Sequence, residues 1–214
     1  VYDGSEIHEA VLTLLHPDRC GAEVVMAAPD KPQMHVVDHL SGEPTGETRN
    51  VLVESARIAR GKIADLASID GAAFDAVVLP GGFGAAKNLS DFASRGEACA
   101  VDPGVERVLS EAHRAGRPIG VLCISPVIAA RLLPGVEVTI GNDTQTARAI
   151  RAMGAGHAER QADDICIDER LRVVSTPAYM SARGIGEVDQ GIGQVIEAVL
   201  QMAAAPVPPA AARG

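Results

Sequence analysis

The sequence has 214 residues, enough for one domain with a sizeable hydrophobic core. Its formal net charge is −9 and it has no cluster of lysine and arginine, which argues against nucleic acid and anionic membrane surfaces as partners. No stretch approaches the roughly 18 consecutive apolar residues of a membrane span, and no signal peptide is visible.

The cysteines are scattered without a Cys-x-x-Cys pair, which indicates neither a zinc site nor a disulfide framework. They are Cys20, Cys99, Cys123 and Cys166. Reduced thiols and a cytoplasmic location are the simplest inference. We expect no metal and no cofactor.

Near the start of the chain, an apolar stripe at helical spacing predicts an amphipathic helix. Ser5 is its predicted N-cap, Pro17 is expected to end or kink it near His16, and Gly21 to close it. Glu9 lies in its first turns, where the helix dipole favours a carboxylate and where a solvated glutamate is the ordinary interpretation. His8, beside it, is expected to face solvent.

The rest of the first half alternates between predicted strands and helices. Residues 22–28 form a predicted strand and residues 34–40 a predicted edge hairpin strand. A helix is expected over 50–60 and a buried strand over 74–79, whereas 62–70 is ambiguous. Arg49, just before the helix, is ordinarily a solvated cation.

The second half continues the alternation. Helices are expected over 105–115, 144–153 and 185–202, and strands over 118–122, 135–140, 164–168 and 171–175. Such alternation favours a doubly wound α/β sheet with helices on both faces. We expect one domain over residues 1–203, followed by a loose tail over 204–214 that is too rich in proline and alanine to build a core.

Cys123 follows a short apolar run and precedes residues at helical spacing, so it lies at a strand-to-helix corner. There the helix amides point at the side chain, an arrangement that lowers a thiol pKa. The alternative is an inert, buried structural cysteine, a common fate of this residue type.

A second strand runs into the turn Pro80-Gly81-Gly82-Phe83-Gly84. Glycines let backbone N–H groups approach a ligand closely. In a doubly wound sheet, ligands bind at the carboxyl ends of the strands. Both the glycine turn and Cys123 fall at such ends, which predicts an oxyanion-binding pocket that faces a cysteine.

Together these features resemble the ThiJ/PfpI superfamily, which is related to class I glutamine amidotransferase domains. Within it the chain is similar to the ElbB subfamily, a glyoxalase group connected with isoprenoid biosynthesis. The residues that carry the resemblance are 1–9, 47–52, 79–90, 123–126 and Thr176-Pro177-Ala178-Tyr179-Met180.

The resemblance implies a flavodoxin-like fold with the cysteine on a nucleophile elbow, and it assigns roles to individual residues. Cys123 matches the nucleophile and Glu9 the acidic residue that hydrogen-bonds its sulfur. The amides of Gly82 and Ile124 match an oxyanion hole, with Gly81 beside them.

Two further residues and the partners follow from the same resemblance. Asn88 is expected to line the cleft, although a turn-capping asparagine is commoner. Arg49 matches a position near the dimer interface, where it could bind an anionic group. A homodimer is expected, with a small aldehyde as the substrate.

The implied chemistry is glutathione-independent conversion of methylglyoxal or glyoxal to a hydroxy acid. The Cys123 thiolate adds to the aldehyde, Glu9 moves protons, and the amides hold the alkoxide.

The sequence departs from the superfamily at two places. Relatives have a buried strand ahead of Val1-Tyr2-Asp3-Gly4, so this chain is predicted to lack a native-like central strand and to be poorly soluble on its own.

Many relatives also place a histidine where this chain has Thr139-Ile140-Gly141-Asn142-Asp143. Without it the hydrolase-like triad is incomplete, which predicts no protease activity and slow glyoxalase turnover. His157 is expected to be a surface residue.

Other functions use the same region differently. A thiol redox sensor would oxidise Cys123 to a sulfinate held by Glu9. A glutaminase needs a late His-Pro-Glu element, whereas this chain has Thr176-Pro177-Ala178 there.

Overall fold

The computed structural model describes residues 1–206 and contains a four-stranded sheet and two small two-stranded sheets. The main sheet has the order β3-β4-β8-β7. Its strands are β3 (Val77–Leu79), β4 (Ile119–Leu122), β7 (Cys166–Asp168) and β8 (Val173–Thr176). Strands β3, β4 and β8 are parallel, and β7 is antiparallel to β8. The predicted mostly parallel α/β architecture is confirmed.

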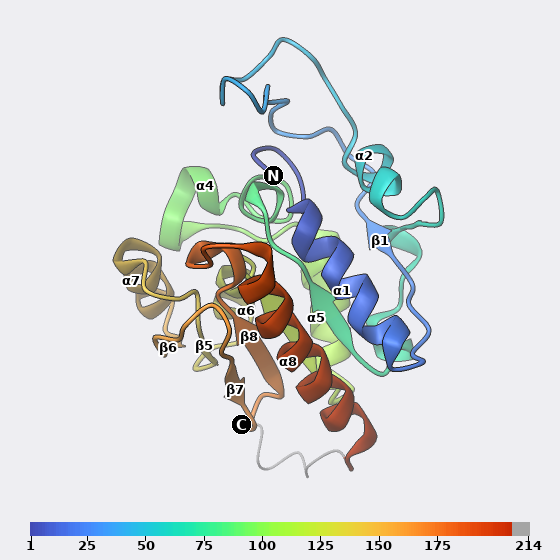
Figure 1. Cartoon of the computed structure of the whole chain (residues 1–214), viewed down its shortest axis with the longest axis vertical. Coiled ribbons are helices and arrows are strands. Elements are labelled where there is room, and N and C mark those ends of the chain that lie inside the picture. The colour runs from blue at the N-terminus through green and yellow to red at the C-terminus, as the bar shows by residue number, and fades with distance from the viewer. Residues whose placement is uncertain (207–214) are drawn as a thin grey trace.

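Alternate residues of the central strands face two hydrophobic clusters, so the sheet is covered on both faces. Val121 and Val173 pack into a cluster with α5 (Pro103–Arg114), α6 (Pro126–Leu132) and α7 (Thr144–Ala152). Leu122 and Val174 pack on the opposite side against α8 (Ile185–Ala204). Helix α8 runs beside α1 (Ile7–Arg19) across this second face (Figure 1).

The smaller sheets are parallel pairs. Strand β1 (Ala27–Ala28) pairs with β2 (Ala64–Asp65), and β5 (Glu137–Val138) pairs with β6 (Gly156–His157). Within residues 1–206, no strand joins the β1-β2 sheet to β3, so β3 is an edge of the main sheet. Val24 and Val25, just before β1, are exposed.

The remaining elements of residues 1–206 are three short α-helices and four 3-10 helices, and a long loop projects from the body. The 3-10 helices span Leu66–Ser68, Gly71–Ala73, Gly96–Ala98 and Ala178–Met180. Helix α2 spans Val51–Ile58, α3 spans Phe83–Lys87 and α4 spans Phe92–Arg95. The segment before α2 extends away from the sheet in Figure 1. It is held by isolated bridges such as Val37 with Pro44.

Several predicted boundaries are wrong. The strand expected over 22–28 shrinks to Ala27–Ala28, and 34–40 is an extended loop rather than an edge strand. Glu6, not Ser5, caps α1, because its side chain accepts a hydrogen bond from Glu9 N.

Helix α1 does not end at Pro17 but continues to Arg19, and the chain leaves the helix at Cys20 and Gly21, in agreement with the closure expected at Gly21. Proline has no N–H to donate, but Pro17 lies in the last turn of the helix, so only one intrahelical hydrogen bond is lost. Its carbonyl still accepts hydrogen bonds from Cys20 N and Ala22 N. Helix α8 extends to Ala204, so the first residue of the predicted tail is helical, and residues 207–214 of that tail lie outside the described residues.

Candidate active site

Cys123 lies on a strained corner between β4 and α6. Its φ is +59°, in the left-handed region that a residue with a Cβ adopts only when its surroundings hold it there. The Cys123 N–H donates to Thr176 O at 3.0 Å, which ties the corner to the end of β8. The side chain is only 7% exposed. The predicted strand-to-helix corner at Cys123 is confirmed.

Glu9 reaches this cysteine from the first turn of α1 and is fully buried. Its side chain shares a hydrogen bond with the Cys123 thiol. One carboxylate oxygen, Oε2, accepts from Gly81 N at 2.9 Å, and the other, Oε1, accepts from Tyr179 N at 3.2 Å. Three separate segments therefore fix the carboxylate beside the sulfur.

The backbone amides of Gly82 and Ile124 donate to the Cys123 sulfur. Gly82 has a φ of +95°, and a Cβ there would lie 2.3 Å from Glu6 N, so only glycine fits this turn. The structure thus brings together Cys123, Glu9, Gly81, Gly82 and Ile124, as the family resemblance implies.

The first residues of the chain brace the glycine turn from outside. Glu6 N donates to Gly81 O at 3.0 Å, and Gly84 N donates to Gly4 O at 2.9 Å. Phe83 N also donates to Val1 O at 2.9 Å. Residues 1–6 therefore hold the two amides that face Glu9 and Cys123 in position.

Burial controls the ionisation of the pair. Desolvation raises the pKa of Glu9 to about 7, although the Tyr179 and Gly81 amides oppose the change. Desolvation and the nearby Glu9 charge also raise the pKa of the Cys123 thiol, and outweigh the Gly82 and Ile124 amides. The expectation of a lowered thiol pKa is therefore wrong in the resting site. The thiol is protonated and Glu9 is the group that titrates near neutrality.

Two predicted site residues lie outside this cluster. Asn88 is buried with both ends of its amide engaged, since Nδ2 donates to Asp3 O and Oδ1 accepts from Met34 N, both at 2.9 Å. Its contacts tie the N-terminal segment to the projecting loop. Arg49 is paired with Glu47 at 2.8 Å and with Glu54 at 3.5 Å, so its charge is already balanced.

No role was predicted for Tyr179, although residues 176–180 contribute to the family resemblance. His8 is exposed, as expected, but its Nδ1 shares a hydrogen bond of 2.7 Å with the Tyr179 hydroxyl. His157, predicted at the surface, is half-buried, and its Nε2 lies 3.4 Å from Ile140 N.

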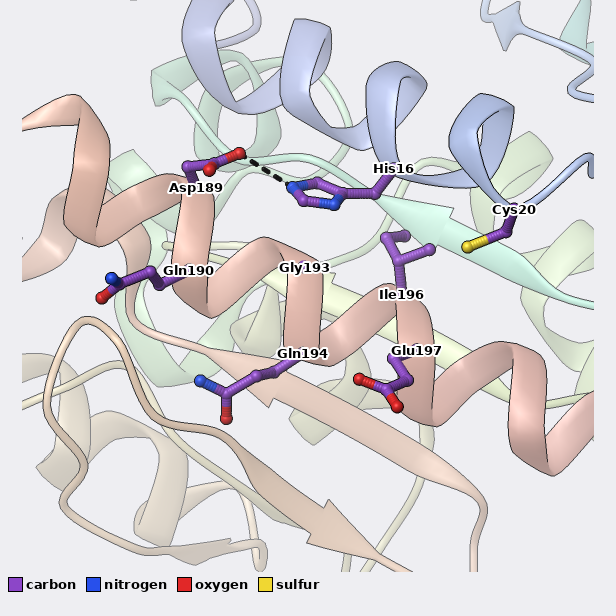
Figure 2. Close-up of a pocket in the computed structure, with 8 residues that line it drawn as sticks. All are labelled: His16, Cys20, Asp189, Gln190, Gly193, Gln194, Ile196 and Glu197. Atoms are coloured by element: carbon purple, nitrogen blue, oxygen red, sulfur yellow. Dashed lines mark hydrogen bonds and ion pairs between the residues drawn. The ribbon is translucent and has the colours of Figure 1, made fainter.

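A separate groove of about 550 Å³ lies between α1 and α8 and contains none of these residues (Figure 2). His16 Nε2 lies 2.9 Å from Asp189 Oδ1 across it. Among residues 1–206, no three His, Cys, Asp or Glu side chains are placed to hold a metal ion. No helix in the same range combines the length and apolarity needed to cross a bilayer.

Known proteins resemble the chain along nearly its whole length. It is 52% identical to the human mitochondrial glutamine amidotransferase-like class 1 domain-containing protein 3, over 94% of this chain and 79% of the relative. It is 50% identical to the rat mitochondrial ES1 protein homolog, over 94% of this chain and 80% of that protein. No family model matches the chain.

Solved structures agree with the fold. An isoprenoid biosynthesis protein with an amidotransferase-like domain from Ehrlichia chaffeensis is 39% identical, with a TM-score of 0.87 over 94% of this chain and 93% of that chain. Drosophila melanogaster DJ-1beta is 17% identical, with a TM-score of 0.53 over 95% and 92% of the two chains, and shows the fold alone.

These relatives correct one expectation and establish the family. The predicted cytoplasmic location is contradicted, because the human and rat relatives are both named mitochondrial proteins. Free cysteines indicate a reducing environment but do not identify the compartment. The chain belongs to the family of ES1 and glutamine amidotransferase-like class 1 domain-containing proteins, which have the DJ-1/ThiJ/PfpI fold.

Proposed function

We propose that this chain is a cofactor-independent glyoxalase that converts small 2-oxoaldehydes such as methylglyoxal and glyoxal to hydroxy acids, as the similarity to the ElbB subfamily implies. The observation that carries the proposal is the buried pair of Cys123 and Glu9, in which a carboxylate with a pKa of about 7 shares a hydrogen bond with a thiol. A base that is half-ionised near neutral pH suits repeated proton transfer.

The first step joins the thiol to the aldehyde. Glu9 takes the Cys123 proton while sulfur bonds to the aldehyde carbon, so the raised thiol pKa is overcome by proton transfer within the pair. The amides of Gly82 and Ile124, which donate to the sulfur in the resting site, lie close enough to stabilise the alkoxide that forms. Glu9 then returns the proton to that oxygen, which gives a hemithioacetal.

The next steps move hydrogen between two carbons. The Glu9 carboxylate removes the proton from C1 and returns it to C2, while the hydroxyl proton passes from O1 to O2 through an enediol. The product is a thioester of the hydroxy acid on Cys123. Water hydrolyses the thioester, which releases the hydroxy acid and restores the thiol.

The surroundings of the pair favour small, neutral substrates. Cys123 is 7% exposed, so a bulky molecule cannot reach its sulfur without movement of the protein. Glu6 adds a second negative charge that acts on Glu9, and like charges disfavour an anionic substrate at the same place.

The test is methylglyoxal consumption with chiral detection of lactate. We expect turnover in the wild type and its loss in Cys123→Ala and Glu9→Gln. Cys166→Ala is the matched control, because Cys166 is also buried but lies in β7 and contacts Glu137 O. Absence of lactate from a folded wild-type protein would remove the glyoxalase proposal.

The lactate assay, together with a measurement of how fast peroxide oxidises Cys123, separates this proposal from a thiol redox sensor. A peroxide sensor depends on a low-pKa, accessible thiol, whereas Cys123 is buried and its thiol pKa is raised. Rapid oxidation of Cys123 by peroxide without lactate formation would favour the sensor.

Two broader aspects of the function are also proposals. A connection with isoprenoid biosynthesis is supported by the similarity to the isoprenoid biosynthesis protein of Ehrlichia chaffeensis. A homodimer follows from the family resemblance, and light scattering of the purified protein tests it.

A further inference from the structure

Tyr179 contacts α1 at two points from the turn that follows β8. Its N–H donates to Glu9 Oε1 at 3.2 Å, and its hydroxyl shares a hydrogen bond of 2.7 Å with His8 Nδ1. The two rings are tilted, with centroids 5.7 Å apart. Because His8 and Glu9 are consecutive, these bonds attach the turn to two neighbouring positions of one helix.

The turn is strained at the residue before Tyr179. Ala178 is fully buried and has a φ of +44°, in the left-handed region that a residue with a Cβ rarely adopts. Hydrogen bonds within the turn, such as Met180 N to Pro177 O at 3.0 Å, close it locally but do not attach it to α1. The side-chain bond to His8 supplies an attachment that is independent of Glu9.

Each element packed around the Glu9 carboxylate contributes a group that influences it. Glu6 approaches from the start of α1, the Cys123 thiol from the elbow, the Gly81 amide from the glycine turn and the Tyr179 amide from the turn after β8. The Tyr179 and Gly81 amides each donate to one oxygen of the carboxylate, and both favour its ionised form. The placement of the Tyr179 amide therefore has a direct effect on Glu9.

We propose that Tyr179 is a positioning residue for Glu9, and that the hydrogen bond between its hydroxyl and His8 holds the strained turn where its amide meets the carboxylate. This inference deepens the proposed function, in which Glu9 is the base, and rests on it for its catalytic meaning. The geometry itself can be tested without substrate.

The test is Tyr179→Phe, which removes one oxygen and keeps the ring. Carboxyl ¹³C NMR of protein labelled in glutamate follows the Glu9 titration, with Glu9→Gln to assign the signal. We expect the midpoint to rise by about half to one pH unit, the effect of weakening one hydrogen bond to a carboxylate. Tyr2→Phe is the control, because the Tyr2 ring stacks on His39. An unchanged midpoint in Tyr179→Phe overturns the proposal.

Substitutions of His8 provide the rescue. His8→Ala removes the partner of the hydroxyl and should raise the midpoint as Tyr179→Phe does. His8→Asn keeps a short side chain that can bond the hydroxyl and should restore the wild-type value. Equal midpoints in His8→Ala and the wild type contradict the proposal. A shifted midpoint in a protein without lactate formation would sustain the positioning role and reject only the glyoxalase function.

Discussion

The backbone of Gly81 passes so close to Cys123 that no side chain fits between them. A Cβ on Gly81 would lie 2.4 Å from the Cys123 Cβ and 2.6 Å from Glu9 Oε2. This approach allows the Gly81 amide to reach the Glu9 carboxylate at 2.9 Å. The absence of a side chain at residue 81 is therefore part of what aligns the pair.

Gly81→Ala is predicted to reduce turnover by about 100-fold, because displacement of reacting groups by roughly 1 Å has an effect of that order. Overpacking should also lower the free energy of unfolding by about 1–3 kcal/mol. Lactate formation and thermal unfolding measure the two effects. Gly186→Ala is the control, since a Cβ there meets nothing within 4 Å. Near-normal turnover in Gly81→Ala would show that the close contact is not needed for alignment.

The features that sequence reasoning predicted correctly are those with local signals. Cys123 between an apolar run and a helix, and the glycine turn at the end of β3, could both be found without coordinates. Long-range pairing could not be found in the same way. Residues 22–28 have the composition of a strand, yet only Ala27 and Ala28 find a partner, in β2. Strand formation depends on a neighbour that the local pattern does not specify.

The electrostatics of the site were missed for a related reason. The strand-to-helix corner indicates amides that favour a thiolate, and those amides are present at Gly82 and Ile124. Their effect is outweighed by the burial of Cys123 and by the charge of Glu9, which depend on how α1 packs over the elbow. Asn88 shows the same limit, because its partners Asp3 and Met34 are distant in sequence.

The raised pKa of Glu9 predicts a specific pH dependence of stability. Its carboxyl has a pKa near the ordinary 4.5 when unfolded and about 7 when folded, so the folded state binds the proton more tightly. The stabilisation is complete below pH 4.5 and is lost as the pH rises through 7, by roughly 3 kcal/mol in total.

Denaturant unfolding of the wild type and Glu9→Gln from pH 4.5 to pH 8 tests this dependence. The free energy of unfolding of the variant minus that of the wild type should increase across this window. A difference that stays constant with pH would contradict a raised Glu9 pKa. Glu197→Gln provides a control, because Glu197 lies on the exposed side of α8 and pairs with Gln201.

Alkylation should distinguish the two roles of Glu9. At pH 8, iodoacetamide is predicted to modify exposed Cys20 well before Cys123, which is buried and has a raised thiol pKa. Glu9→Gln removes a nearby negative charge, so Cys123 should be alkylated several-fold faster even though lactate formation is lost. Mass spectrometry of peptides containing each cysteine measures both rates. Slower alkylation of Cys123 in Glu9→Gln would show that the Glu9 charge does not raise the thiol pKa.

Asn88→Ala and Arg49→Ala should differ in their effect on the free energy of unfolding. Asn88→Ala leaves the Met34 N–H without its acceptor and removes the shorter of two hydrogen bonds to the Asp3 carbonyl, which keeps the bond from Gln33 Nε2 at 3.3 Å. The variant is predicted to lower the free energy of unfolding by about 1–3 kcal/mol. Arg49→Ala breaks exposed ion pairs with Glu47 and Glu54, and should leave the free energy of unfolding nearly unchanged, because solvent screens such pairs. Denaturant unfolding measures both.

Turnover of methylglyoxal by the two variants completes the comparison, at a temperature where both are folded. Neither side chain touches the Cys123–Glu9 pair, and Arg49 has no contact with the glycine turn, so the pH at which Glu9 titrates should be unchanged in Arg49→Ala. Asn88→Ala should lose turnover only as far as the segment over residues 1–6 loosens its hold on the glycine turn. A large loss of turnover in Arg49→Ala, with stability unchanged, would instead place its guanidinium in substrate binding.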